Sequence, residues 1–275
     1  MSKLTFRILQ FAPLASVLFL TQPPVVGAAP LDDVLAATEE QSPVDIRPDN
    51  TYFGRLSPLQ FSLSSNTALS VVNTGSPDHE SAIKANILPR AGSVTVDGTT
   101  YDLAQFHFHT PSEHLENSKA TPLELHMVFA DATDNLLVVG RWINQGSFNS
   151  ALDPIFSDLP LATETHQVSD FNLNLLLPDN LQSFRYSGSL TTPPFTEGVT
   201  WVNLAQPLEM AASQIQAYRD LFPEGNTRPV QPLGDQNILT DVPGFVINVP
   251  EPQTYAMLLA GLGLLGFMSR RSRQA

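Results

Sequence analysis

The feature that most constrains the fold is a run of alternating side chains at residues 105–109, Gln-Phe-His-Phe-His. Successive side chains of a β-strand point to opposite faces, so Gln105, His107 and His109 share one face and the two phenylalanines occupy the other. The phenylalanine face predicts packing in a hydrophobic core. Just upstream, residues 93–103 alternate around an Asp-Gly pair, a strong β-hairpin signal. The pattern predicts a long strand that ends with two imidazoles on one face.

The rest of the body also has the pattern of short strands. Apolar or alternating runs predict strands at 122–131, 135–143 and 198–204, and helical spacing of apolar residues predicts one helix at 212–221. The chain of 275 residues, 42% hydrophobic, suits one domain of roughly 200 residues with appendages. We therefore expect a mostly β protein with minor helix: a single domain around a large, mainly antiparallel β-sheet.

The N-terminal appendage, residues 1–29, has the organisation of a secretory signal peptide. Lys3 and Arg7 precede an apolar run at 8–20, and small residues follow. The alternative is a membrane anchor, although the run is short for a span of about 20 residues.

The C-terminal appendage, residues 243–275, resembles the PEP-CTERM sorting tail of Gram-negative bacteria. Pro-Glu-Pro at 250–252 is followed by an apolar segment at 255–268 and an arginine cluster. The resemblance implies an exosortase-type processing enzyme as a partner and transient membrane contact through the tail. A plain C-terminal anchor is the alternative. Both ends predict an exported protein, periplasmic, outer-surface or extracellular, with the functional domain at residues 30–242.

The charge of the body excludes one class of partner. Residues 30–250 contain 26 acidic and 9 basic side chains, a net charge of about −17. Such a surface repels nucleic acid phosphates, so no nucleic acid partner is expected. The chain has no cysteine, which excludes disulfides and thiolate metal sites.

The histidines of the long strand predict a metal site. His126, from the predicted strand at 122–131, would lie beside His107 and His109 if the two strands pair. Three neutral imidazoles with one open position are typical of catalytic zinc, which lowers the pKa of its bound water to about 7. Gln105 and Glu124 each precede a histidine by two residues and can accept its second N–H. Alone, the His-x-His pair is weak evidence, because such pairs also occur on exposed strands by chance.

Ordered motifs along residues 40–240 make the chain similar to the α-class carbonic anhydrases. These motifs are QSPVDI at 41–46, QFHFH at 105–109, SEH at 112–114, ELH at 124–126, YSGSLTTPP at 186–194, TWV at 200–202 and NTRPVQPL at 226–233. The resemblance implies a zinc enzyme that hydrates carbon dioxide reversibly to bicarbonate and a proton, with zinc-bound hydroxide as the nucleophile. A slow or non-catalytic binding module of the extracellular matrix is the alternative.

The resemblance also assigns the three histidines as zinc ligands and gives them partners. Gln105 and Glu124 would each orient the histidine two positions later, and the backbone carbonyl of Asn226 would orient His109. Thr191 would accept a hydrogen bond from the nucleophile and donate its own proton to Glu113.

The remaining implied residues support the site or line it. His114 would be structural, bonded to groups such as Tyr186. The implied substrate pocket consists of Val128, Val138, Leu190, Thr192 and Trp201. A cupin oxygenase also matches His107-x-His109 followed by Glu113, but the glycine and the fourth ligand of that motif are missing.

The chain departs from the family in three places. The aromatic stretch that normally precedes QSP is replaced by LDDVLAATEE, and Gly198 stands where an extracellular cysteine is common. Ser76 occupies the usual position of the proton-shuttle histidine. His79 could substitute, since histidine titrates near neutral pH, or it could be a solvent-facing loop residue. His166, in a polar run, is expected in an exposed loop.

We expect proton export to limit turnover, because serine cannot transfer a proton near neutral pH. Ser76→His should raise turnover at low buffer concentration, whereas kcat/KM should vary little with buffer. His79→Ala separates the two interpretations of His79: turnover that falls at low buffer identifies a shuttle, and unchanged turnover identifies a surface residue. Carbon dioxide hydration followed over a series of imidazole-type buffer concentrations measures this. Fast, buffer-independent turnover of His79→Ala would contradict both.

Overall fold

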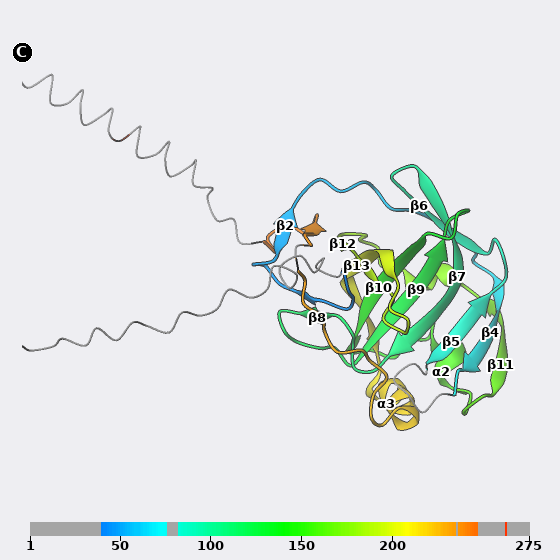
Figure 1. Cartoon of the computed structure of the whole chain (residues 1–275). Coiled ribbons are helices and arrows are strands. Elements are labelled where there is room, and N and C mark those ends of the chain that lie inside the picture. The colour runs from blue at the N-terminus through cyan, green and yellow to red at the C-terminus, as the bar shows by residue number, and fades with distance from the viewer. Residues whose placement is uncertain (1–39, 76–81, 235, 247–261, 263–275) are drawn as a thin grey trace, which may run out of the picture. The chain divides into compact units, whose positions relative to one another are not determined.

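The structure is a computed structural model that describes residues 40–75, 82–234, 236–246 and 262. Figure 1 shows most of its strands side by side in one twisted sheet. The strands are β1 (Asp45–Ile46), β2 (Thr51–Phe53), β3 (Gln60–Leu63), β4 (Thr67–Asn73), β5 (Ile83–Ile87), β6 (Gly92–Val96), β7 (Thr99–His109), β8 (Leu115–Glu116), β9 (Leu123–Ala130), β10 (Leu136–Gln145), β11 (Thr165–Phe171), β12 (Ser183–Ser189), β13 (Glu197–Met210) and β14 (Ile238–Thr240). The helices are α2 (Asp153–Phe156), the 3₁₀ helix η1 (Leu173–Leu176) and α3 (Ala212–Leu221).

The strands form a twelve-stranded sheet and a separate pair. The main path of the sheet runs β11-β4-β5-β7-β9-β10-β13-β12-β14-β2, with β6 beside β7 and β3 beside β6, while β1 pairs with β8. Most pairs are antiparallel, but β10 with β13, β14 with β2 and β1 with β8 are parallel. The predicted class is confirmed, and the predicted helix at 212–221 is α3.

A β-bulge in β7 determines which side chains face which side of the sheet. Leu103 pairs with Phe129 but Gln105 pairs with Val128, so Ala104 is an extra residue in β7. A bulge shifts the alternation by one position. Leu103 therefore shares the core face with Phe106 and Phe108, whereas in a regular strand it would share a face with His107.

The two faces of the sheet carry separate apolar clusters. The larger one contains the β7 phenylalanines and Val139, and α3 contributes Ile215 and Tyr218 to it. The smaller one contains Val138 and other residues of β10, β12 and β13. Neighbouring residues of β10 thus pack into different clusters, as expected for a central strand buried on both faces.

One prediction is wrong and others lie outside the described residues. His166 was expected in an exposed loop, but it belongs to β11, opposite Val71, with its side chain 31% exposed. A polar run can form an edge strand because only one of its faces must pack against the core. Ser76, His79, residues 1–29 and most of the tail are outside the described part. Within the described residues no helix has both the length and the hydrophobicity needed to cross a membrane.

Candidate metal centre

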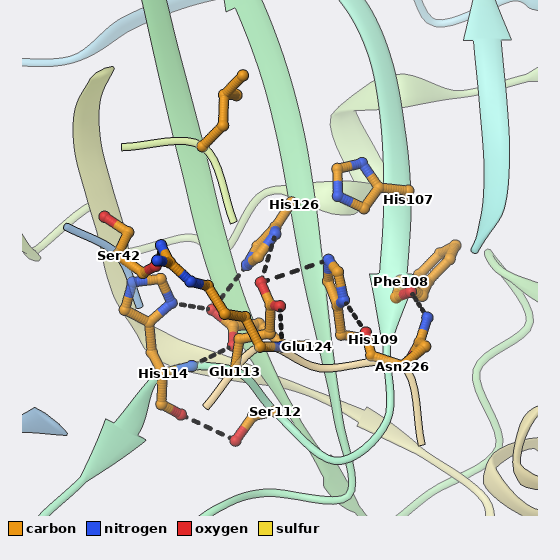
Figure 2. A network of polar contacts seen from close by, with 12 residues as sticks. Ser42, His107, Phe108, His109, Ser112, Glu113, His114, Glu124, His126 and Asn226 are labelled. Atoms are coloured by element: carbon orange, nitrogen blue, oxygen red, sulfur yellow. Dashed lines mark hydrogen bonds and ion pairs between the residues drawn. The ribbon is translucent and has the colours of Figure 1, made fainter. Parts of the chain in front are cut away.

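Three imidazoles meet where β7 pairs with β9. His107 lies directly opposite His126 in the antiparallel register, and His109 is two residues further along β7. Directly opposed and next-but-one residues project from the same face of a sheet. One ring nitrogen from each of the three histidines lies within 4.8 Å of the corresponding atoms of the others. Figure 2 shows the rings of His109 and His126 turned toward each other, with His107 beside them.

Each imidazole ring has a neighbouring polar group on one nitrogen, which determines the nitrogen that remains available to bind a metal. The Nδ1 atom of His107 is 2.9 Å from Gln105 Oε1, and that of His109 is 2.7 Å from the backbone carbonyl of Asn226. Both rings therefore present Nε2. His126 is oriented the other way, with Nε2 3.0 Å from Glu124 Oε1, so that it presents Nδ1. All three orienting groups named from the sequence lie beside the expected histidine.

The surroundings favour neutral imidazoles at two positions. Burial, reinforced by the other two imidazoles and by Lys84, holds the pKa of His107 well below its usual value. Burial likewise lowers the pKa of His109. Burial also acts to lower the pKa of His126, but the carboxylates of Glu124 and Glu113 outweigh it and raise that pKa. Neutral imidazole is the form whose lone pair binds a metal.

Glu124 is a buried carboxylate with several donors around it. Its Oε1 is 2.8 Å from His114 Nδ1, and its Oε2 accepts from the backbone N–H of His114 at 2.8 Å. Burial alone would raise the pKa of Glu124, yet His114 and His126 hold it well below its usual value. The ionised carboxylate is thus stabilised between two imidazoles.

His114 extends the hydrogen-bond network from Glu124 toward Tyr186 and Ser42. Its Nε2 is 2.7 Å from the hydroxyl of Tyr186, which donates to Ser42 Oγ at 2.9 Å. Burial raises the pKa of Tyr186 well above its usual value, so the hydroxyl keeps its proton. The backbone N–H groups of Ser42 and Ser189 complete the network by donating to each other's hydroxyls at 3.0 and 3.1 Å. His114 is thus fully buried beside Tyr186, the neighbour that the resemblance implies for it.

Glu113 lies beside His109 and His126, and Thr191 lines the same cavity as the histidines. Glu113 Oε1 accepts from the backbone N–H of Arg228 at 2.8 Å, and Oε2 is 3.5 Å from His109 Nε2. Among the described residues, Oε2 of Glu113 is buried without a hydrogen-bond partner. No hydrogen bond joins Thr191 to Glu113 in this part of the chain, so their predicted contact stays a prediction.

A cavity of about 220 Å³ opens over the three histidines. Its lining includes four apolar residues expected in the substrate pocket: Val128, Val138, Leu190 and Trp201. Polar side chains of Gln105, Thr191 and Thr192 also line it. The site thus combines a nitrogen cluster with both apolar and polar side chains.

The histidine cluster fits a metal ion. Nε2 of His109 is buried and has no hydrogen-bond partner in the described structure, which is costly unless something accepts its lone pair. A second group, His114 with Glu124 and His126, also has the required spacing. In that group the Glu124 carboxylate accepts from His114, and its Oε1 lies 3.0 Å from His126 Nε2. His107, His109 and His126 are therefore the set whose ring nitrogens remain available as metal ligands. Three nitrogen ligands suit Zn²⁺.

The family model for eukaryotic-type carbonic anhydrases matches residues 32–242, and a model of the PEP-CTERM protein-sorting motif matches residues 248–273. The chain belongs to the α-class carbonic anhydrase family. A curated carbonic anhydrase of Klebsiella pneumoniae is 35% identical over 201 residues, which is 72% of this chain and 79% of that protein. One of Neisseria gonorrhoeae is 33% identical over 202 residues, 73% of this chain and 77% of that protein.

Solved α-carbonic anhydrases share the fold. The enzyme of Thermovibrio ammonificans in complex with the inhibitor sulfanilamide matches with a TM-score of 0.68 and 37% identity, over 73% of this chain and 86% of that one. A hyperthermostable carbonic anhydrase from a hydrothermal vent chimney matches with a TM-score of 0.68 and 38% identity, over 74% and 87%.

Three cavity residues were not anticipated from the sequence. Thr74, Ala82 and Lys84 line the cavity from β5 and the residues that flank the β4–β5 connection. Lys84 could have been found, because it stands between Ile83 and Ala85, two buried residues of one strand. In an alternating strand such a lysine must lie on the face opposite the core.

Proposed function

We propose that this carbonic anhydrase binds Zn²⁺ through His107, His109 and His126 and hydrates carbon dioxide reversibly to bicarbonate and a proton. The observation that carries the proposal is the convergence of three oriented imidazole nitrogens in a cavity that is also lined by apolar side chains. When bound, zinc would supply a nucleophile at neutral pH by lowering the pKa of a water molecule. Three protein ligands leave the fourth position for that water.

The apolar side chains suit the substrate. Carbon dioxide is linear and uncharged, and Val128, Val138 and Trp201 offer it a surface that holds no competing water. A fixed polar group of the same cavity can then direct the attacking oxygen toward its carbon.

Thr191 and Glu113 are proposed as the groups that direct the attack. Thr191 lines the cavity with the histidines, and the free Oε2 of Glu113 is a buried acceptor close to His109 and His126. A threonine that donates its proton to a buried carboxylate must accept from its other neighbour. The hydroxyl would thereby hold one lone pair of the attacking oxygen toward carbon dioxide.

We further propose export, with residues 1–29 as a signal peptide. The PEP-CTERM segment would contact the membrane transiently and would be the substrate of an exosortase-type enzyme. The matched sorting motif supports this. The enzyme would then act in the periplasm, on the outer surface or outside the cell.

Export predicts that the mature protein lacks both ends, because each is removed during transport. Intact-mass measurement of the protein from a PEP-CTERM-sorting host should show the loss of roughly the first 29 residues and of the tail after Pro250-Glu251-Pro252. A mass that retains both ends would contradict the proposal, and replacement of Glu251 by Ala is the control that should preserve the tail.

His109→Ala should abolish zinc retention and carbon dioxide hydration together, because it removes one of three ligands. Metal analysis of the purified protein and a hydration assay measure the two effects. His166→Ala is the matched control, since His166 lies in β11 away from the cavity lining, and it should keep both properties. Full activity of His109→Ala without zinc would contradict the assignment.

Thr191→Ala should keep zinc but lower turnover by roughly two orders of magnitude, the usual effect of removing one preorganised hydrogen-bonding group. The same metal and hydration measurements apply. Thr165→Ala, an exposed threonine of β11, is the control and should leave turnover unchanged. Unchanged turnover of Thr191→Ala would remove this hydroxyl from the mechanism.

A further inference from the structure

Lys84 is the one cavity-lining residue of the described structure with a permanent positive charge. It lies on β5 directly opposite His107 of β7, in the antiparallel register that also pairs Ala85 with Phe106. Residues paired in this way project from the same face, so Lys84 shares the histidine face while Ala85 packs in the core. Its side chain is partly buried and lines the cavity.

Among the described residues that line the cavity, none is an Asp or Glu. No ion pair of the described part of the chain involves Lys84. Glu113 and Glu124, which lie beside the histidines, are 2% and 0% exposed. Glu124 is already stabilised by His114. Lys84 is paired with His107 across the two strands, so its charge acts close to the histidine cluster.

The chain as a whole has the opposite sign. The formal net charge of its 275 residues is −13. The only other lysine of the described residues, Lys119, is exposed and outside the cavity lining. A protein of this charge repels anions from its surroundings. This repulsion does not act on carbon dioxide, because carbon dioxide is neutral. It does act on bicarbonate, and it opposes the approach of that anion to the cavity.

We propose that Lys84 is an anion-recruiting residue, which sets the affinity of the cavity for bicarbonate and other small monovalent anions. The inference rests on the proposed carbon dioxide reaction for the identity of the physiological anion. The geometry gives the ammonium group a place beside the metal ligands from which it can attract an anion without occupying the metal's open position. Its attraction is strongest inside the cavity, where protein walls reduce screening by water and salt.

The test compares zinc-loaded wild-type protein with Lys84→Gln, Lys84→Arg and Lys119→Gln. Thiocyanate serves as a small monovalent probe, and isothermal titration calorimetry gives its Kd without any turnover. Lys84→Gln should weaken thiocyanate binding by roughly three- to tenfold at low ionic strength, and the difference should shrink at about 0.5 M salt. The product-inhibition constant of bicarbonate in hydration should rise by a similar factor.

The control variants separate a local effect from net charge. Lys119→Gln removes the same charge from an exposed position and should leave the thiocyanate Kd near the wild-type value. Lys84→Arg keeps the charge and should retain most of the affinity. Equal Kd values for wild type and Lys84→Gln, equal weakening by Lys119→Gln, or absence of thiocyanate binding to the wild type would each overturn the inference. Lys84-dependent binding in a protein that does not hydrate carbon dioxide would support it and overturn the proposed function instead.

Discussion

The antiparallel pairing of β7 with β9 is the constraint on which the rest of the site depends. It sets His107 opposite His126 and places His109 opposite Glu124. The bulge at Ala104 allows the same strand to pack against the core. In a regular strand Leu103 and Phe106, three positions apart, would point to opposite faces, whereas the bulge lets both face the core. A slip of one residue in this register would turn the imidazoles into the core and the phenylalanines into the cavity. The fold and the histidine cluster therefore have a common determinant, and neither can be altered here without the other.

The buried polar network behind the histidines explains how the register tolerates a charge in the core. An isolated buried carboxylate is costly, and Glu124 is completely buried. His114 satisfies both of its oxygens, and Tyr186 and Ser42 satisfy His114 in turn. These residues come from β9, β12, the connection between β7 and β8, and the segment at 41–46. The network therefore also ties the start of the described chain to the centre of the sheet. A buried polar network destabilises a protein when some of its groups lack hydrogen-bond partners. Here the network holds the Glu124 carboxylate in place, and that carboxylate fixes the orientation of His126.

Much of the candidate site could be predicted from the alternation of side chains along single strands. The remaining features depend on contacts between residues that are far apart in the sequence. The faces of Gln105, His107 and His109 follow from a period of two, and Glu124 and His126 follow in the same way. The carbonyl of Asn226 lies 117 residues beyond His109 and came only from resemblance, because no local pattern brings a distant loop to a ring nitrogen. The parallel pairing of β10 with β13 and the bulge at Ala104 were also beyond local pattern. His166 was misassigned because an edge strand carries little hydrophobic signal.

The same alternation that buries Ala85 exposes Lys84 to the cavity, so the electrostatics of the centre follow from the fold rather than from the overall composition. An acidic exterior and a basic cavity are compatible because the two act over different distances. Exposed charges are screened beyond about 10 Å at 0.1 M salt, whereas a charge enclosed by protein walls acts on its neighbours with less screening. A small anion inside the cavity is therefore governed by Lys84 and the imidazole cluster more than by the net charge of −13. The acidic composition therefore determines which charged molecules the surface repels. The register of β5 with β7, which places Lys84 in the cavity, determines which small ions the cavity can attract.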